Sequence, residues 1–167
     1  MACMICAPAF AQDDYAPFEV FGGYDFTRLI YDGGTLNMNG FAVAFTSNFN
    51  PTFGIKAELG RVSGSEYDVG SNVFSFVAGP QIATQLSDSA RVFGHAMLGF
   101  ARAGTDLPGV NSESGFAMAF GGGVDWTISD RIAIRAPQFD YMPTKIGKDS
   151  TQNNIRILAG IVFRFGN

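Results

Sequence analysis

Residues 115–126 read Gly-Phe-Ala-Met-Ala-Phe-Gly-Gly-Gly-Val-Asp-Trp, a stretch in which large and small side chains alternate. The large apolar residues all share one parity: Phe116, Met118, Phe120, Val124 and Trp126. The other parity holds small residues and one acid: Ala117, Ala119, Gly121, Gly123 and Asp125. A period of two is that of a β-strand, whose successive side chains point to opposite faces. The stretch therefore predicts a strand with one bulky apolar face and one narrow face.

The same alternation recurs in seven other segments, and none of them has a convincing helical stripe: 18–27, 40–49, 53–60, 73–84, 91–103, 131–141 and 154–165. Tight polar turns are predicted at 48–52, 86–90 and 127–130. Longer loops are predicted between them, at 28–37, 63–72, 104–114 and 142–153. This alternation of short and long connections is typical of outer-membrane barrels, which have short periplasmic turns and long external loops.

Composition narrows the class of protein. The chain has 167 residues, enough for one domain, and only 16% of them are charged, against roughly 25% in a typical soluble domain. The sequence contains no run of about 18 apolar residues, the length that would predict a membrane helix. With 11 Lys and Arg against 15 Asp and Glu, there is no basic stripe, which excludes nucleic-acid binding. A soluble β-rich domain and a membrane barrel remain.

Side-chain size decides between these two classes. The interior of an eight-stranded barrel has room for only a modest number of side chains, so the many Phe and Ile residues must face outward. The sequence therefore predicts an all-β protein, an eight-stranded antiparallel up-and-down transmembrane β-barrel. Aromatic residues near the strand ends suit the two interfacial girdles: Phe18, Phe49, Phe53, Trp126, Tyr141 and Phe165.

The narrow face carries charges of both signs. Pro137 cannot donate to a strand ladder, and a one-residue slip there turns Gln138 and Asp140 inward. With that slip, five acids meet five bases and one histidine in a predicted interior network: Glu19, Asp25, Lys56, Glu58, Arg91, His95, Asp125, Arg135, Asp140, Arg156 and Arg164. Equal numbers of acidic and basic side chains are what a closed barrel interior requires, because an unpaired buried charge is costly. The alternative is a soluble sheet with solvated surface charges.

The first eleven residues predict the remnant of a secretory signal peptide. They are apolar, contain Cys3 and Cys6, and end in the small-x-small sequence of residues 9–11, as at a signal cleavage site. A positively charged start is missing, so we interpret residues 1–11 as a truncated signal and residues 12–167 as the barrel domain. A short apolar strand is the alternative interpretation.

Candidate sites for catalysis or metal binding are few. His95 is the sole histidine, and the residue two positions on is Met97 rather than a nucleophile, so we expect a structural histidine and no catalytic residue. One histidine, with no cysteine after residue 11, predicts no metal site. Gly121–Gly123 lacks the Lys and Ser or Thr of a phosphate loop, and no cofactor is expected.

Several motifs resemble a known family in their order and spacing. These are residues 120–126, Ile132-Ala-Ile-Arg135, residues 138–141, Val77-Ala-Gly-Pro80, Phe93-Gly-His95 with Leu98-Gly99, and residues 160–165. Together they resemble the outer-membrane β-barrel domain family, the OmpA-type set of small eight-stranded barrels. The resemblance implies a location in the Gram-negative outer membrane. It also implies that Phe163 and Phe165 form the aromatic signal for the barrel assembly machinery, displaced here by Gly166 and Asn167.

The resemblance implies a monomer with a structural or surface-interaction role. Its expected partners are outer-membrane lipid, lipopolysaccharide and the barrel assembly machinery, and the ligand of the loops stays open. A narrow ion channel, a lipid-modifying barrel enzyme and a soluble lipocalin-like carrier are the alternatives.

Overall fold

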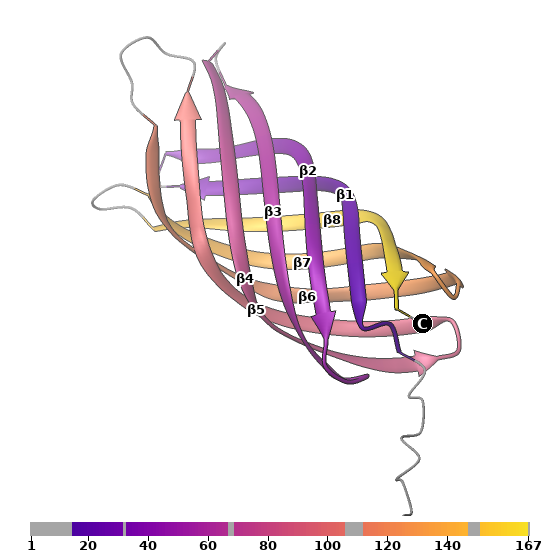
Figure 1. The fold of residues 1–167 in the computed structure, drawn as a ribbon. Helices are drawn as coiled ribbons and strands as arrows, with labels where there is room; N and C mark the ends of the chain where they lie inside the picture. Colours follow the sequence, from indigo (N-terminus) through magenta and orange to yellow (C-terminus); the bar gives the residue numbers. More distant parts are fainter. Residues whose placement is uncertain (1–14, 32, 67–68, 106–111, 147–150, 167) are drawn as a thin grey trace, which may run out of the picture.

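The computed structural model describes residues 15–31, 33–66, 69–105, 112–146 and 151–166. They form eight β-strands: β1 (Phe18–Tyr31), β2 (Gly34–Asn48), β3 (Phe53–Glu66), β4 (Val69–Ser87), β5 (Ala90–Thr105), β6 (Glu113–Ser129), β7 (Ile132–Ile146) and β8 (Thr151–Phe165) (Figure 1). No helix in the described residues is long and apolar enough to cross a membrane.

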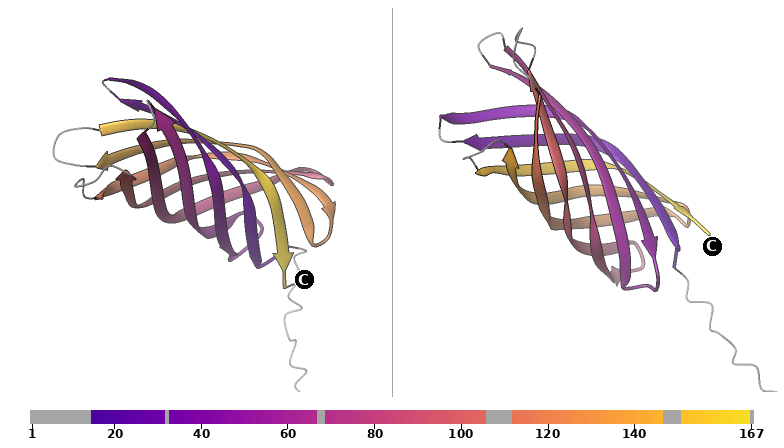
Figure 2. Two further views of the ribbon diagram at one scale, coloured as in Figure 1. Left: turned by 90° about the horizontal axis from the view of Figure 1, so that it is seen from above. Right: turned by 60° about the vertical axis from the view of Figure 1, so that its left-hand side comes forward.

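Each strand pairs antiparallel with the next one along the chain, and β1 also pairs with β8, which closes the barrel (Figure 2). The β1–β8 seam runs from the pair Phe18 and Phe165 to the pair Ile30 and Asn153. Closure leaves no sheet edge along this seam, as a barrel in lipid requires. The predicted eight-stranded up-and-down barrel is thus confirmed.

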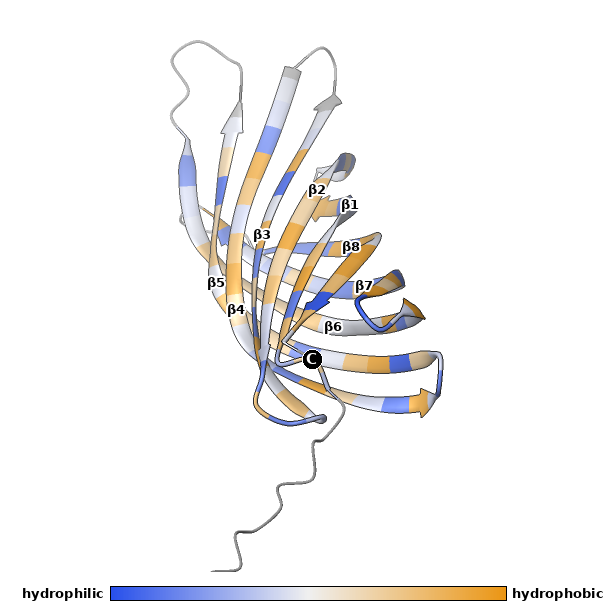
Figure 3. Ribbon diagram, turned by 45° about the vertical axis from the view of Figure 1, so that its right-hand side comes forward, coloured by the Kyte–Doolittle hydropathy of each residue, from blue (hydrophilic) through white to orange (hydrophobic). Residues whose placement is uncertain are grey.

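The outer surface of the barrel carries the large apolar side chains, as the size argument predicted. Phe41 on β2 is 57% exposed, whereas the next residue, Ala42, is fully buried in the interior. The strands show the same alternation of apolar and polar residues along their length (Figure 3). The aromatic residues expected at the strand ends all lie on the exposed face: Phe18, Phe49, Phe53, Trp126, Tyr141 and Phe165.

The register of β7 shifts at Pro137. Arg135 pairs with Gly160 on β8, but the next paired residue, Gln138, lies opposite Leu158. Between these two pairs, β7 therefore has two residues, whereas β8 has only one. Arg135 and Gln138 both point inward, although they have opposite parity.

The strands are longer than predicted, and three of the four predicted long loops are wrong for most of their residues: 28–37, 63–72 and 142–153. β1 continues to Tyr31 and β2 begins at Gly34, inside the loop predicted at 28–37. β3 and β4 likewise extend through most of 63–72, and β5, β6, β7 and β8 shorten the other two loops. The residues of these extensions lack a regular alternation of large apolar and small side chains, yet a ladder needs only backbone N–H and C=O groups. At 19 residues, β4 far exceeds the ~9–11 residues of one membrane crossing.

The two ends of the barrel differ. We call the end with connections 49–52, 88–89 and 130–131 the turn end, and the opposite end, where the strands extend, the hairpin end. β3, β4 and β5 rise together at the hairpin end, whereas β1, β2 and β8 lean away from them (Figure 1). The predicted signal remnant, residues 1–11, lies outside the described residues.

Candidate functional site

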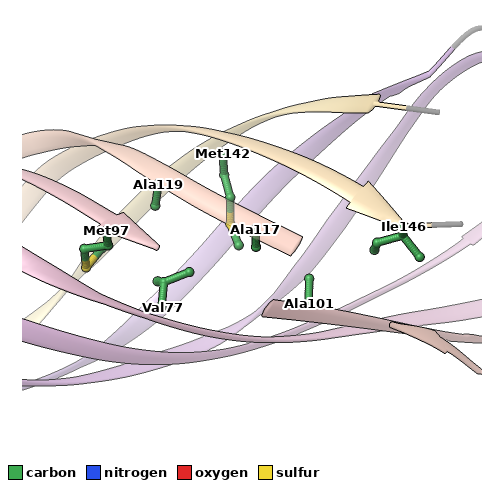
Figure 4. Close-up of a cluster of buried hydrophobic side chains, with 7 residues drawn as sticks. All are labelled: Val77, Met97, Ala101, Ala117, Ala119, Met142 and Ile146. Carbon is green, nitrogen blue, oxygen red and sulfur yellow. The ribbon is translucent and has the colours of Figure 1, made fainter. Parts of the chain in front are cut away.

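The interior of the barrel has two parts of different chemistry. Toward the hairpin end it holds an apolar cluster that we call the hairpin-end cluster: Val77, Met97, Ala101, Ala117, Ala119, Met142 and Ile146 (Figure 4). Toward the turn end it holds buried charged and amide side chains and a second apolar cluster: Phe21, Ala42, Ala44, Ala133, Leu158 and Val162. The interior is therefore not polar throughout, contrary to what the sequence had led us to expect. Methionine and alanine fill the part toward the hairpin end, because the narrow face supplies them at the same inward parity as the charges.

Arg156 on β8 is the hub of the buried charges. Its Nη2 donates to Asp25 Oδ2 at 2.7 Å and to Glu58 Oε1 at 2.8 Å. Its Nε also donates to Asp25 at 3.1 Å, and its Nη1 lies 3.8 Å from Asp140 Oδ2. One guanidinium thus contacts carboxylates from β1, β3 and β7. The fixed fork of five N–H donors makes such multiple pairing possible.

Lys56 and His95 extend this network on either side. Lys56 Nζ lies 2.8 Å from Glu58 Oε2, and the lysine is fully buried. His95 Nε2 lies 3.0 Å from Asp140 Oδ1, although the contact is too poorly aligned to count as a hydrogen bond. Gln138 donates to Asp140 Oδ2 at 2.8 Å. The amide is at this place only because the register shift at Pro137 turned it inward.

A second pair lies nearer the turn end. Arg135 makes two parallel hydrogen bonds to Asp125, at 2.7 and 2.9 Å. Its guanidinium also faces two aromatic rings, 4.0 Å from the centre of Phe93 and 5.1 Å from that of Phe21. Ion pairing and cation–π contact both favour the charged guanidinium, which offsets the cost of burying it.

The turn-end mouth contains the last predicted charges. Arg91 Nη1 donates to Glu19 Oε1 at 2.5 Å, and Arg164 Nε lies 3.6 Å from the same oxygen. Arg164 also donates to Thr127 at 3.0 Å. These groups line an open cavity of about 680 Å³ at this end of the barrel.

All eleven residues of the predicted interior network point inward. Ten of them form ion pairs with one another, and His95 lies 3.0 Å from Asp140 Oδ1. The sequence analysis did not identify four neighbours that contact these charges: Phe21, Thr27, Phe93 and Met142. Their inward parity was the available signal. Parity alone does not say which inward side chains touch a charge.

Gln81 gives a first testable expectation. Its side chain is 1% exposed, and neither amide atom has a hydrogen-bond partner among the described residues. A buried unsatisfied amide is destabilising, and methionine has a similar volume. We expect Gln81→Met to raise the free energy of unfolding by about 1 kcal/mol in urea titrations of the detergent-folded protein. A loss of similar size would show that the amide has a stabilising partner.

The described residues contain no cluster of three or more His, Cys, Asp or Glu side chains suited to a metal ion. His95 stacks on Phe93, with ring centres 5.9 Å apart, and its Nε2 lies 3.0 Å from Asp140 Oδ1. This arrangement is that of a side chain held in a packed network.

An eight-stranded closed barrel with bulky apolar residues outside and paired charges inside defines a membrane-spanning β-barrel. The chain belongs to the outer membrane protein beta-barrel domain family, whose sequence profile matches residues 1–165. It is a protein of the outer membrane. No curated protein matches the chain in sequence.

Solved structures share this fold at low sequence identity. Neisserial surface protein A superposes with a TM-score of 0.80 at 14% identity, covering 90% of this chain and 98% of its own. Ail, the attachment invasion locus protein of Yersinia pestis, gives 0.66 at 21% identity, covering 90% and 99%. OprG of Pseudomonas aeruginosa gives 0.58 at 11% identity, covering 92% and 97%. At these identities the likeness shows the fold alone.

Proposed function

We propose that this protein is an outer-membrane scaffold: a barrel with a closed interior that displays its extended hairpins outside the cell, in a structural or surface-interaction role. The observation that carries the proposal is the filled interior. Arg156 contacts carboxylates from three strands at one level of the barrel, and the hairpin-end cluster occupies the next level. Two successive layers of contacting side chains leave no wide aqueous path.

The orientation in the membrane follows from the two ends. Barrels of this class place short turns in the periplasm and the longer connections outside. The turn end would then face the periplasm, and the extended ends of β3, β4 and β5 would stand above the outer leaflet.

On the same grounds we propose that Phe163 and Phe165, both exposed on β8, serve as the signal for the barrel assembly machinery.

Planar-bilayer recording tests the closed interior. We expect no steady openings in the nanosiemens range from the purified, folded protein, because conduction requires both layers to open. A variant that removes side chains from both layers, Met97→Ala with Arg156→Ala, serves as a positive control for the recording. Steady nanosiemens openings from the unmodified protein would refute the closed interior.

A narrow channel is the second candidate, and one contact favours it. Glu58 is shared between Lys56 at 2.8 Å and Arg156 at 2.8 Å, so it could keep one partner while releasing the other. Brief, small openings that disappear in Glu58→Gln would support this candidate. The same recording therefore distinguishes a permanently closed interior from a narrow channel that opens briefly.

A further inference from the structure

The ladders between neighbouring strands are not equally regular around the barrel. The ladders β8–β1, β1–β2, β2–β3 and β3–β4 keep one register throughout. So does the ladder between β5 and β6, in which every residue from Ala90 to Ala103 is paired. The ladders β4–β5 and β6–β7, in contrast, each contain a register shift and an unpaired gap. The strands β5 and β6, which we call the β5–β6 pair, are thus joined more firmly to each other than to their neighbours.

The gap between β4 and β5 lies at Pro80. The register is the same at Ala78, which pairs with Leu98, and at Gln81 beyond the gap, but the two positions between them are unpaired. The ladder of Pro80 with β3 is unbroken, so the backbone nitrogen of Pro80 faces β5. Proline has no N–H, and the carbonyl group of Ala96, which lies opposite, therefore lacks its ladder donor.

The gap between β6 and β7 has the same cause. The register is unchanged from Ala117, which pairs with Thr144, to Phe120, but the two positions between them are unpaired. Pro143 lies in this gap, and its ladder with β8 is unbroken. Its backbone nitrogen therefore faces β6, and the carbonyl group of Met118 opposite it lacks a donor.

The two gaps lie at nearly the same depth in the wall. Met118 is the partner of Leu98 on β5, two residues from Ala96. Ala96 and Leu98 are both exposed on the apolar outer wall, where lipid cannot supply a hydrogen bond. Each missing bond therefore weakens the joint on one side of the β5–β6 pair.

Behind both gaps the interior is apolar. Met97 follows Ala96 on β5 and belongs to the hairpin-end cluster, as do Ala119 and Met142 at the second gap (Figure 4). The contacts that tie the β5–β6 pair to charges on other strands lie on the turn-end side of the gaps: Arg91 with Glu19, His95 with Asp140, and Asp125 with Arg135. Separation of the strands at the gaps would therefore bring no charge into lipid.

We propose that the β5–β6 pair is a movable section of the barrel wall. It moves away from β4 and β7 together at the two proline gaps, while the charged contacts hold its turn end in place. The motion exposes Met97 and Met142 to the apolar part of the membrane. The layer around Arg156 stays closed, because its carboxylates come from β1, β3 and β7.

Amide hydrogen exchange, followed by NMR of the full-length protein in detergent micelles, tests this motion. Successive amides of one strand face different neighbours. On β5 the amides of Ala96 and Leu98 face β4, whereas those of Met97 and Gly99 face β6. We expect protection factors on the order of tenfold lower for the first two. The same alternation is expected on β6, low for amides that face β7 and high for those that face β5: Met118 and Phe120 against Ala117 and Ala119.

Restoring one missing donor tests whether the pair moves as a unit. Pro80→Ala returns an N–H to the ladder with β5, so every opening of the pair has to break one more hydrogen bond. We expect protection to rise about fivefold at Ala96, and also at Met118 on the far side of the pair. Pro51→Ala, at an exposed proline in the turn 49–52, is the matched control and should change neither.

Two results would overturn the movable section. Equal protection of alternate amides along β5 would show that the gap leaves the joint intact. A rise confined to the β4 side in Pro80→Ala would show two independent loose joints. The shift of the gel band on boiling checks that each variant folds. The proposal does not depend on the closed interior, whose failure would appear as conduction in the bilayer recordings and leave these exchange patterns unchanged.

Discussion

Replacing Arg156 with methionine is expected to destabilise the folded barrel by about 3–5 kcal/mol, the cost of leaving buried charges without their partner. Asp25 would lose its arginine, and Glu58 would keep only Lys56. Asp140 would keep only His95 and the Gln138 amide. Methionine fills a similar volume, so the loss reports charge rather than a cavity.

The measurement is urea unfolding in lipid vesicles, followed by the gel shift between folded and boiled protein. Arg131→Met is the matched control, because Arg131 is exposed at the turn end, and we expect its unfolding curve to be unchanged. Arg156→Lys should lie between the two, since one ammonium cannot reproduce the fork that meets Asp25 and Glu58 together. An unchanged midpoint for Arg156→Met would show that the carboxylates do not depend on this hub.

Gly160→Val is expected to prevent closure of the barrel. Gly160 on β8 lies opposite Gly23 on β1, at the seam where the last strand meets the first. A Cβ atom at Gly160 would lie 2.2 Å from the carbonyl oxygen of Gly22 and 2.4 Å from the Cα of Gly23. Both are backbone atoms, so the strands themselves would have to separate. The cost exceeds the roughly 1–3 kcal/mol of ordinary overpacking.

Gly22→Val is the control for this substitution at the same seam. A Cβ atom at Gly22 meets nothing within 4 Å, and the residue is exposed on the outer wall. Valine suits a strand facing lipid, so we expect normal folding. Refolding into vesicles gives the readout: Gly160→Val should yield no heat-shifted band, and Gly22→Val a full one. A heat-shifted band of normal yield from Gly160→Val would contradict the close approach at the seam.

The alternation of side chains was enough to predict the barrel and the direction of most residues. Phe116 and Ala117 are neighbours in the sequence and therefore point to opposite faces of the strand. Their sizes indicate which face is which: the large Phe116 faces lipid, and the small Ala117 faces the interior. The shift at Pro137 was also predictable, because a residue without an N–H interrupts the ladder. The positions at which the strands end were not predictable. Near the hairpin end, β2 and β3 are rich in Gly, Ser, Thr and Asn, and only Leu36, Met38 and Val62 are apolar, so periodicity does not distinguish a strand there from a loop.

The sequence by itself determined that this chain forms a barrel and which charges enter it, because period and side-chain size act within each strand. Only the tertiary structure decided how those charges pair. Asp25 and Arg156 are 131 residues apart and meet because β1 closes against β8. Glu58 reaches the same guanidinium across the interior from β3. Pairing depends on the depth at which each strand places its charge, and that depth is set by the register around the whole barrel, which no single segment contains.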